Sequence, residues 1–219
     1  MSPARGTGDT AQTLARGLDV LDAVAASTRG LTLTELGERL SVGRTVTHRL
    51  VSTLVERRLL YRGDGGRYLI GVGAARLIRS IQQTLRDAAR AELDLLAADL
   101  GATAHLAVAE GDEAVAVAVA EPLHTTFHIA YRTGTRTPLG VGALGAALLA
   151  ARSGRAGTFE SEGQLTPGAK GVVAAVPGMV GLPCAVGVVT LAPVDTSTWH
   201  ARVAAAAAAI GASLSAEQP

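Results

Sequence analysis

The spacing of apolar residues changes near residue 101, and this change divides the chain into two parts. Up to Leu100, apolar residues recur mainly at intervals of three and four positions, which predicts amphipathic helices. Beyond that point, short apolar runs bounded by Gly, Asp and Pro predict strands, and alanine-rich stretches predict further helices. The order of elements predicts an α+β protein of two domains, the second with a mostly antiparallel sheet and packed helices.

Three helices are expected in the first part of the chain. The first covers Gln12–Ala26, where leucines and valines keep helical spacing. Thr32 and Glu35 have the spacing of a capping box, in which each side chain accepts a hydrogen bond from the other residue's backbone amide. A short second helix therefore starts there. Ser41–Gly43 predicts a tight turn, with Gly43 as the N-cap of a third helix.

The third helix lies within Ser41–Tyr61 and has two chemically different faces. At about 100° per residue, its apolar face gathers Val46, Thr47, Leu50 and Leu54. The opposite face gathers Arg44, Thr45, His48, Arg49 and Ser52. Guanidinium groups match phosphates and the edge of guanine, and short hydroxyl side chains allow close approach to bases. The polar face therefore suits DNA, although an isolated helix of this kind is usually just solvated.

A β-hairpin is predicted directly after this helix. Two short apolar segments, LLYR (59–62) and RYLIG (67–71), flank the turn sequence GDGG (63–66). Three helices followed by a hairpin predict a winged helix-turn-helix, with Arg62 and Arg67 on either side of the tip of the wing. The alternative is a small helical domain with another purpose.

The distribution of charge supports a contact with nucleic acid. The whole chain has a formal net charge of +1, but residues 1–71 hold ten arginines against seven acidic residues. Within residues 44–67, six arginines stand against only Glu56 and Asp64. The positive charge is therefore concentrated in the third helix and the wing, where a nucleic-acid footprint requires it.

The remaining elements outline the second domain. We expect a disordered tail over residues 1–10, a helix-turn-helix domain over 11–72, a linker helix over 73–86 and an effector-binding domain over 87–219. Strands are predicted at Thr103–Glu110, Glu113–Glu121, Thr126–Tyr131, Gly171–Val176 and Cys184–Leu191. Helices are predicted at Gly140–Arg152 and Thr196–Ser215, with a loop-rich segment at Ser153–Lys170.

The segment Gly140–Gly145 matches the dinucleotide-binding pattern G-x-G-x-x-G, and Glu160 follows at the distance of a ribose-binding acid. The preceding sequence RTGTRTPL is not a buried apolar strand, which disfavours a nucleotide site. A helix N-terminus lined by glycine, whose free amides would hold a carboxylate, fits better. The plain structural alternative is close packing of small residues on the sheet.

Other chemistry is not indicated. Cys184 is the only cysteine, and the histidines lack metal-ligand spacing. No serine or cysteine nucleophile has a general base placed beside it by a known motif. We therefore expect that the protein is not an enzyme and binds neither a metal ion nor a cofactor. The sequence has no signal-peptide pattern and no run of about 18 apolar residues. We therefore expect a cytoplasmic protein without membrane contact.

The stretch LTLTELGERLSVGRTVTHRLVSTLVERRLLYRGDGGRYLIG resembles the winged helix-turn-helix of IclR-type bacterial transcriptional regulators, and AHLAVAEGDEAVAVA and RTGTRTPLGVGALGAALLA are similar to their effector-binding domain. The resemblance implies a DNA-binding domain, a linker helix, a GAF-like ligand domain, and dimers or tetramers on palindromic operators. It places DNA contacts at Arg44, Thr45, His48 and Arg49, to which the helical wheel adds Ser52 and the predicted wing adds Arg62 and Arg67. It places the effector-binding amides at about Ala143 and Leu144. With the glycines of the helix start and two further family positions, the candidate effector residues are Gly142, Ala143, Leu144, Gly145, Ser161 and Gly171.

The chain departs from the family pattern around the expected effector site. Gly171 stands where the family commonly has a cysteine. The family also commonly has an acidic residue near the position of Ser161 or Glu162, and this chain departs from that pattern. The segment between Leu149 and Thr158 is shorter than is usual in the family. An organic acid, a neutral or apolar effector, or no effector all remain alternatives. We predict a dimeric DNA-binding transcriptional regulator modulated by a small molecule. The alternatives are a nucleotide-binding enzyme using Gly140–Gly145 and a protein-interaction module.

Overall fold

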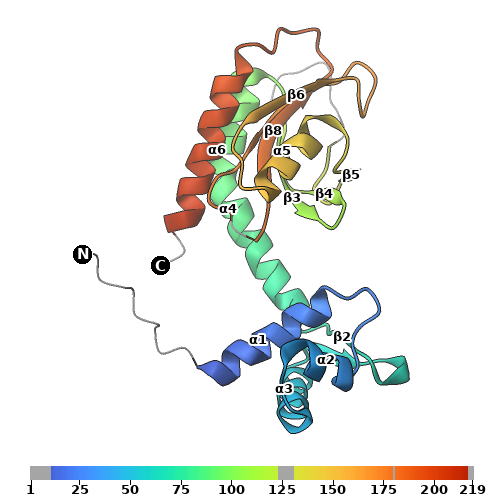
Figure 1. Ribbon diagram of the computed structural model, residues 1–219. Coiled ribbons are helices and arrows are strands. Elements are labelled where there is room, and N and C mark those ends of the chain that lie inside the picture. Colours follow the sequence, from blue (N-terminus) through green and yellow to red (C-terminus); the bar gives the residue numbers. More distant parts are fainter. Residues whose placement is uncertain (1–10, 123–130, 180, 217–219) are drawn as a thin grey trace, which may run out of the picture. The chain divides into compact units, whose positions relative to one another are not determined.

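A computed structural model describes residues 11–122, 131–179 and 181–216. The predicted tail, 1–10, and most of the predicted strand Thr126–Tyr131 lie outside these residues. The chain divides into two compact units, Met1–Ser80 and Ile81–Pro219. We call them the N-terminal and C-terminal units and describe each by itself (Figure 1). No helix in the described ranges is long and apolar enough to cross a membrane.

The N-terminal unit is a winged helix-turn-helix, as predicted. Its elements are α1 (Gln12–Ala25), α2 (Leu33–Leu40), α3 (Arg44–Glu56), β1 (Leu60–Arg62), a 3₁₀ turn (Asp64–Gly66) and β2 (Tyr68–Ile70). The antiparallel register pairs Leu60 with Ile70 and Arg62 with Tyr68. The core beneath consists of the buried residues Val20, Ala23, Val24, Leu36, Leu50, Val51, Leu54 and Leu60.

Local hydrogen bonds set the start of α2 and of α3. The predicted capping box is present: the Glu35 amide donates to Thr32 Oγ1 over 3.3 Å, and the Thr32 amide donates to Glu35 Oε2 over 2.7 Å. Ser41 then takes a left-handed conformation with φ of 54°, which reverses the chain. Gly43 is the N-cap of α3, as expected, and Thr47 Oγ1 donates to the Gly43 carbonyl over 3.2 Å.

The predicted apolar face of α3 differs from the buried arc at two positions, Val46 and Val51. Val46 is 38% exposed, whereas Val51 is 1% exposed. Thr47, Leu50, Val51 and Leu54 are the buried residues of the helix. On the helical wheel, Val46 lies about 90° from the centre of this arc, so it stands at the margin of the core.

The C-terminal unit contains a six-stranded antiparallel sheet in the order β5-β4-β3-β8-β7-β6. Helix α4 (Ala74–Leu100) enters it from the N-terminal unit. The strands and helices that follow are β3 (Thr103–Glu110), β4 (Glu113–Ala120), β5 (Arg136–Pro138), α5 (Gly142–Arg152), β6 (Thr158–Glu162), β7 (Lys170–Ala175), β8 (Cys184–Thr190) and α6 (Trp199–Ala216). This arrangement confirms the predicted α+β class.

Two apolar cores lie on opposite faces of the sheet (Figure 1). On one face, α4 and α6 contribute side chains such as Leu93 and Ile210. Arg202 joins these two helices through ion pairs with Asp99 at 2.9 Å and Glu92 at 3.2 Å. On the other face, α5 packs through Leu144 and Leu148. The second face also carries the candidate ligand site.

Two edge strands were missed by the sequence patterns. The segment Ser153–Lys170 was predicted to be loop-rich, but β6 lies within it and pairs with β7, Phe159 opposite Val173. The sequence TFESE of β6 is rich in polar residues, because one side of this edge strand meets solvent. Strand β5, Arg-Thr-Pro, is equally short of apolar residues.

Gly145 gives the first test, because an added Cβ would lie 2.2 Å from the Leu139 carbonyl oxygen. We expect Gly145→Ala to destabilise the C-terminal unit by ~2 kcal/mol or more, since backbone must shift to relieve the overlap. Gly140→Ala, at a site with nothing within 4 Å of the added carbon, is the matched control. Urea unfolding followed by the fluorescence of Trp199, the single tryptophan, reports on this unit. Equal unfolding midpoints would refute the packing role.

Candidate nucleic-acid interface and ligand pocket

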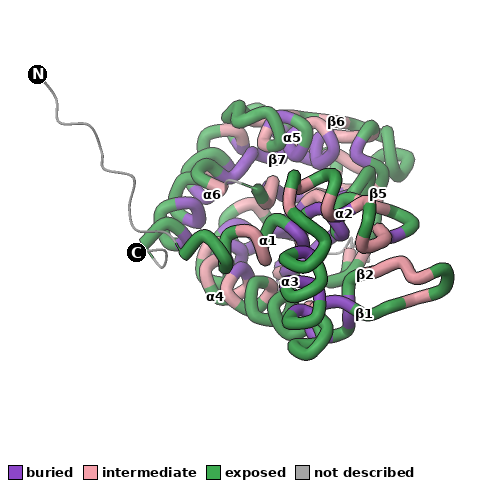
Figure 2. Tube along the Cα trace, turned by 60° about the horizontal axis from the view of Figure 1, so that its bottom comes forward, coloured by how far each residue is buried: buried purple, intermediate pink, exposed green. Residues whose placement is uncertain are grey.

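The polar face of α3 is a surface of five exposed side chains. These are the residues predicted from the helical wheel: Arg44, Thr45, His48, Arg49 and Ser52. Ser52 Oγ lies 3.4 Å from His48 Nδ1, one turn away. Because the opposite arc of α3 is buried, exposed and buried positions alternate along the helix (Figure 2). The guanidinium groups of Arg44 and Arg49 have no ion-pair partner in the described part of the chain.

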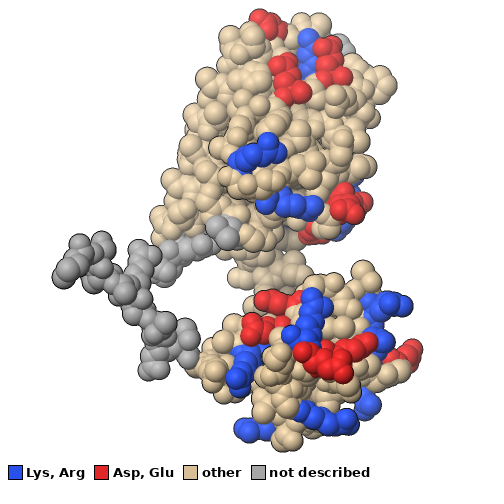
Figure 3. Space-filling model, viewed as in Figure 1, with Lys and Arg blue, Asp and Glu red and all other residues tan. Residues whose placement is uncertain are grey.

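The predicted wing carries an exposed arginine, Arg62, at the end of β1. Its guanidinium lies beside the tip of the hairpin, 3.3 Å from the position of a Cβ added to Gly66. Arginine side chains stand out on the surface of the N-terminal unit (Figure 3).

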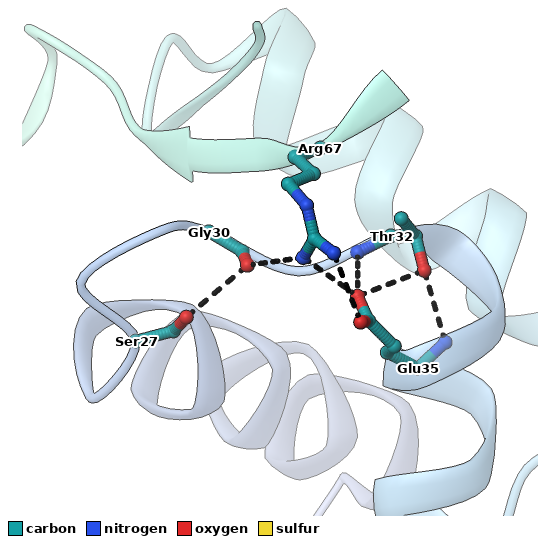
Figure 4. Close-up of polar contacts among 5 residues, drawn as sticks. All are labelled: Ser27, Gly30, Thr32, Glu35 and Arg67. Atoms are coloured by element: carbon teal, nitrogen blue, oxygen red, sulfur yellow. Dashed lines mark hydrogen bonds and ion pairs between the residues drawn. The ribbon is translucent and has the colours of Figure 1, made fainter. Parts of the chain in front are cut away.

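Arg67, which was predicted with Arg62 to contact DNA beside the tip of the wing, has partners within the protein. Its guanidinium donates to the Gly30 carbonyl over 2.9 Å and to both carboxylate oxygens of Glu35, over 3.0 and 3.2 Å (Figure 4). Hydrogen bonds from the amide and the hydroxyl of Thr32, followed by those from Arg67, hold the pKa of Glu35 below its usual value. Arg67 therefore fastens the wing to the start of α2.

The N-terminus of α5 is capped by side chains of the chain itself. The Gly142 amide donates to Gln164 Oε1 over 2.9 Å, and the Ala143 amide donates to Ser161 Oγ over 2.9 Å. The resemblance placed the ligand-binding amides at about Ala143 and Leu144, so one of that pair, Ala143, is capped in this way. Ser161 comes from β6, and Gln164 from the turn after it. Two of the amides at the positive end of the helix thus already have neutral oxygen partners.

A small cavity of about 60 Å³ lies beside this helix start. Four predicted effector residues line it: Ala143, Leu144, Ser161 and Gly171. Gly142 does not line the cavity, but its amide donates to Gln164 and it lies close to Leu165, and both of these residues are in the lining. Gly145 is not among the lining residues, because it packs on the Leu139 backbone. Four of the six predicted effector residues therefore line the cavity, and Gly142 and Gly145 do not.

His105 and Tyr131 also line the cavity, and neither was predicted. Their rings lie 4.8 Å apart, centroid to centroid, and are tilted by 49°. His105 is 3% exposed, and both of its ring nitrogens and the Tyr131 hydroxyl are buried without a hydrogen-bond partner among the described residues. The one sequence signal was a histidine within the apolar strand TAHLAVAE.

Burial keeps both groups uncharged at neutral pH. Desolvation lowers the pKa of His105 to about 4 and raises the pKa of Tyr131 to about 12. Desolvation likewise raises the pKa of Cys184 to about 12, so this thiol is an unreactive part of the core.

The predicted ribose-binding acid has other partners. Glu160 accepts hydrogen bonds from Thr196 and from His200, the latter over 2.9 Å. The first of these bonds, together with the second, holds the pKa of Glu160 below its usual value. With Gly145 packed and the amides of Gly142 and Ala143 capped, the Gly140–Gly145 segment does not form an open phosphate loop. This arrangement disfavours the nucleotide-binding alternative.

Two family models match this chain. The IclR helix-turn-helix domain matches residues 13–64, and the bacterial transcriptional regulator IclR C-terminal domain matches residues 80–157. The HTH-type transcriptional regulator BhcR of Paracoccus denitrificans (strain Pd 1222) is 35% identical over 143 residues, which are 63% of this chain and 50% of that protein. The match thus spans half the length of this curated relative.

Solved structures share the fold. A putative transcriptional regulator of Rhodococcus sp. RHA1 has a TM-score of 0.55 at 19% identity, covering 95% of this chain and 100% of the other. An IclR homologue of Microbacterium hydrocarbonoxydans, in complex with 4-hydroxybenzoate, has a TM-score of 0.54 at 20% identity, covering 93% and 99%. Since family models match both units and together cover more than half of the residues, the chain belongs to the IclR family of bacterial transcriptional regulators.

Proposed function

We propose that this protein is a cytoplasmic transcriptional regulator that binds a palindromic DNA operator and responds to a small-molecule effector. The exposed basic face of α3, whose arginines lack ion-pair partners within the described ranges, is the observation that carries the DNA-binding part. In this proposal residues 11–72 form the DNA-binding domain, residues 73–86 link it to the rest, and residues 87–219 form the effector-binding domain.

The chemistry of α3 fits the major groove of B-DNA. Arg44 and Arg49 are long enough to reach phosphates or the O6 and N7 atoms of guanine. Thr45, His48 and Ser52 lie on the same exposed face and supply shorter hydrogen-bonding groups. Arg62 on the wing adds a contact to the DNA backbone. Arg67 contributes indirectly by holding the wing in place.

Exposed apolar side chains support a homodimer. Leu14 and Leu18 of α1 are 65% and 52% exposed, and Leu77 and Ile78 of α4 are 61% and 52% exposed. The exposed apolar side chains on each of these two helices are poorly solvated by water, and contact with a second copy of the protein would bury them. A symmetric dimer would present two α3 helices to two half-sites of a palindrome. A tetramer formed from two such dimers is compatible with the same contacts.

The cavity beside α5 is the proposed effector site. It places polar atoms of His105 and Tyr131 that lack partners among the described residues between apolar walls, a combination typical of small-molecule sites. The Microbacterium homologue, whose complex contains 4-hydroxybenzoate, has the same fold. An effector would regulate the protein by changing its affinity for the operator.

Loss of either arginine on α3 should weaken operator binding. We expect Arg44→Ala or Arg49→Ala to reduce affinity by about 5- to 150-fold, which corresponds to ~1–3 kcal/mol per lost base contact. Fluorescence anisotropy with duplexes from the gene's own upstream region, at several salt concentrations, measures this change. The slope of log affinity against log salt should also become shallower, because fewer counterions are released.

Arg155→Ala in the C-terminal unit removes the same charge from an exposed site and is the control. It should leave operator affinity within about twofold. If the wild-type protein binds no upstream duplex at low salt, the proposal of DNA binding is wrong. Equal losses in Arg155→Ala and Arg49→Ala would also count against α3 as the recognition element.

Polar substitution of the exposed leucines should disrupt the dimer. We expect Leu18→Ser combined with Leu77→Ser to weaken dimerisation by at least about tenfold, since each buried leucine contributes roughly 1.5–3 kcal/mol. Sedimentation analysis over a range of protein concentrations measures the dissociation constant. Leu95→Ser, also on α4 and 50% exposed, is the control and should leave it unchanged. A wild-type protein that sediments as a monomer would contradict the proposed assembly.

Buried, neutral His105 should make the C-terminal unit less stable in acid. Its pKa is about 4 in the folded state, against an ordinary value of 6.5, so between these values the unfolded chain binds a proton that the folded chain does not. Stability is therefore lost as pH falls from 6.5 towards 4, by ~2 kcal/mol at pH 5.

Urea unfolding at pH 7 and pH 5, followed by Trp199 fluorescence, measures this loss. His105→Leu removes the titrating group, so the variant should lose ~2 kcal/mol less stability than the wild type between the two pH values. The comparison between the two proteins cancels the contribution of the carboxylates. Identical pH dependence in both proteins would show that His105 is not buried in its neutral form.

A further inference from the structure

The cavity beside α5 has a distinctive set of polar groups, and their chemistry bears on which ligand fits. This inference rests on the effector site proposed above and concerns the class of molecule bound there. The cavity is lined by residues from β3, α5, β6, β7, β8 and the turn after β6, together with Tyr131. None of the described lining residues carries a charge at neutral pH.

Two of the amides best suited to an anion are already occupied. The amides of Gly142 and Ala143 lie at the positive end of α5, where a carboxylate would gain from the helix dipole. Each instead donates a 2.9 Å hydrogen bond, to Gln164 Oε1 and Ser161 Oγ respectively. A carboxylate entering the cavity would have to displace these oxygens or remain without these donors.

The groups left without partners among the described residues are neutral. The two ring nitrogens of His105 offer one donor and one acceptor, and the hydroxyl of Tyr131 offers both. The two rings are in contact, at 4.8 Å between centroids, so one ligand group can reach both. Leaving these atoms unpaired costs free energy, and a ligand that bonds to them recovers that cost.

We propose that the cavity selects a small uncharged molecule, with a hydroxyl, carbonyl or amide group bonded to His105 and Tyr131, and discriminates against carboxylates. A carboxylate would lose its hydration shell among Leu144, Leu165 and Val188 without a cation to replace it. A neutral amide or alcohol of the same shape has a much smaller desolvation cost and finds its partners in place.

The size of the cavity limits the ligand. A volume of about 60 Å³ accommodates roughly four water molecules. Leu165 and Gln164 lie in the turn between β6 and β7, which has glycines with positive φ at Gly163 and Gly168. A ligand of a few non-hydrogen atoms fits without movement of this turn.

Matched probes test the charge preference directly. Propionamide and propionate have nearly the same shape and differ in charge at pH 7. Titration of each into the full-length protein, followed by the NMR signals of the His105 ring, measures its binding at this site. We expect propionamide to shift these signals saturably and to bind at least about tenfold more tightly than propionate.

Two variants identify the groups responsible. Tyr131→Phe removes one hydrogen-bonding partner and should weaken propionamide binding several-fold, with the aromatic wall retained. Ser161→Ala releases the Ala143 amide and should increase propionate binding by about tenfold. Glu162→Gln, at an exposed neighbouring position of β6 outside the cavity lining, is the control and should change neither probe's affinity.

The outcomes separate this inference from the proposed function. If propionate binds as tightly as propionamide and shifts the His105 signals, the cavity is an effector site but the preference for uncharged ligands is wrong. If neither probe shifts these signals, both the preference and the effector site are overturned. The proposal of DNA binding is judged independently, by salt-dependent binding of the upstream duplex.

Discussion

Burial of one arc of α3 fixes the direction in which the side chains on the opposite arc of the helix point. Leu50, Val51 and Leu54 lie in the core of the N-terminal unit, and Thr47 bonds to the turn that precedes the helix. Because successive side chains are about 100° apart on a helix, Arg44 and Arg49 are then held outward by that core. The basic surface is thus positioned by the residues beneath it, and its guanidinium groups are available to a partner.

This dependence explains which parts of the N-terminal unit were predictable. Helical spacing and the Thr32–Glu35 motif are local, so the three helices and the capping box were found from sequence. The wheel failed only at the margin of the buried arc, at Val46 and Val51. Arg62 and Arg67 look equivalent beside the hairpin tip, but the partner of Arg67 is Glu35, 32 positions away. No local pattern encodes that contact, so their different roles appear only in the fold.

The C-terminal unit shows the same division between local and distant information. Buried strands such as β3 and β8 are apolar runs and were predicted, whereas the edge strands β5 and β6 meet solvent and lack that signal. The start of α5 was recognised because its glycines are close together in sequence. His105 was missed because strand register, with Gly187 and Val119 on either side, brings it to the cavity.

The capping of α5 connects its fold to its chemistry. A helix N-terminus has free amides that must find acceptors, from solvent, from a ligand or from the protein itself. Here Ser161 and Gln164 supply them from the strand and turn beside the helix. Because neutral side chains already satisfy these two amides, a carboxylate must compete with an intramolecular hydrogen bond for each of them. Among the described residues that line the cavity, the buried side-chain atoms left without a partner are the imidazole nitrogens of His105 and the hydroxyl of Tyr131, and these are the atoms to which we propose a ligand bonds.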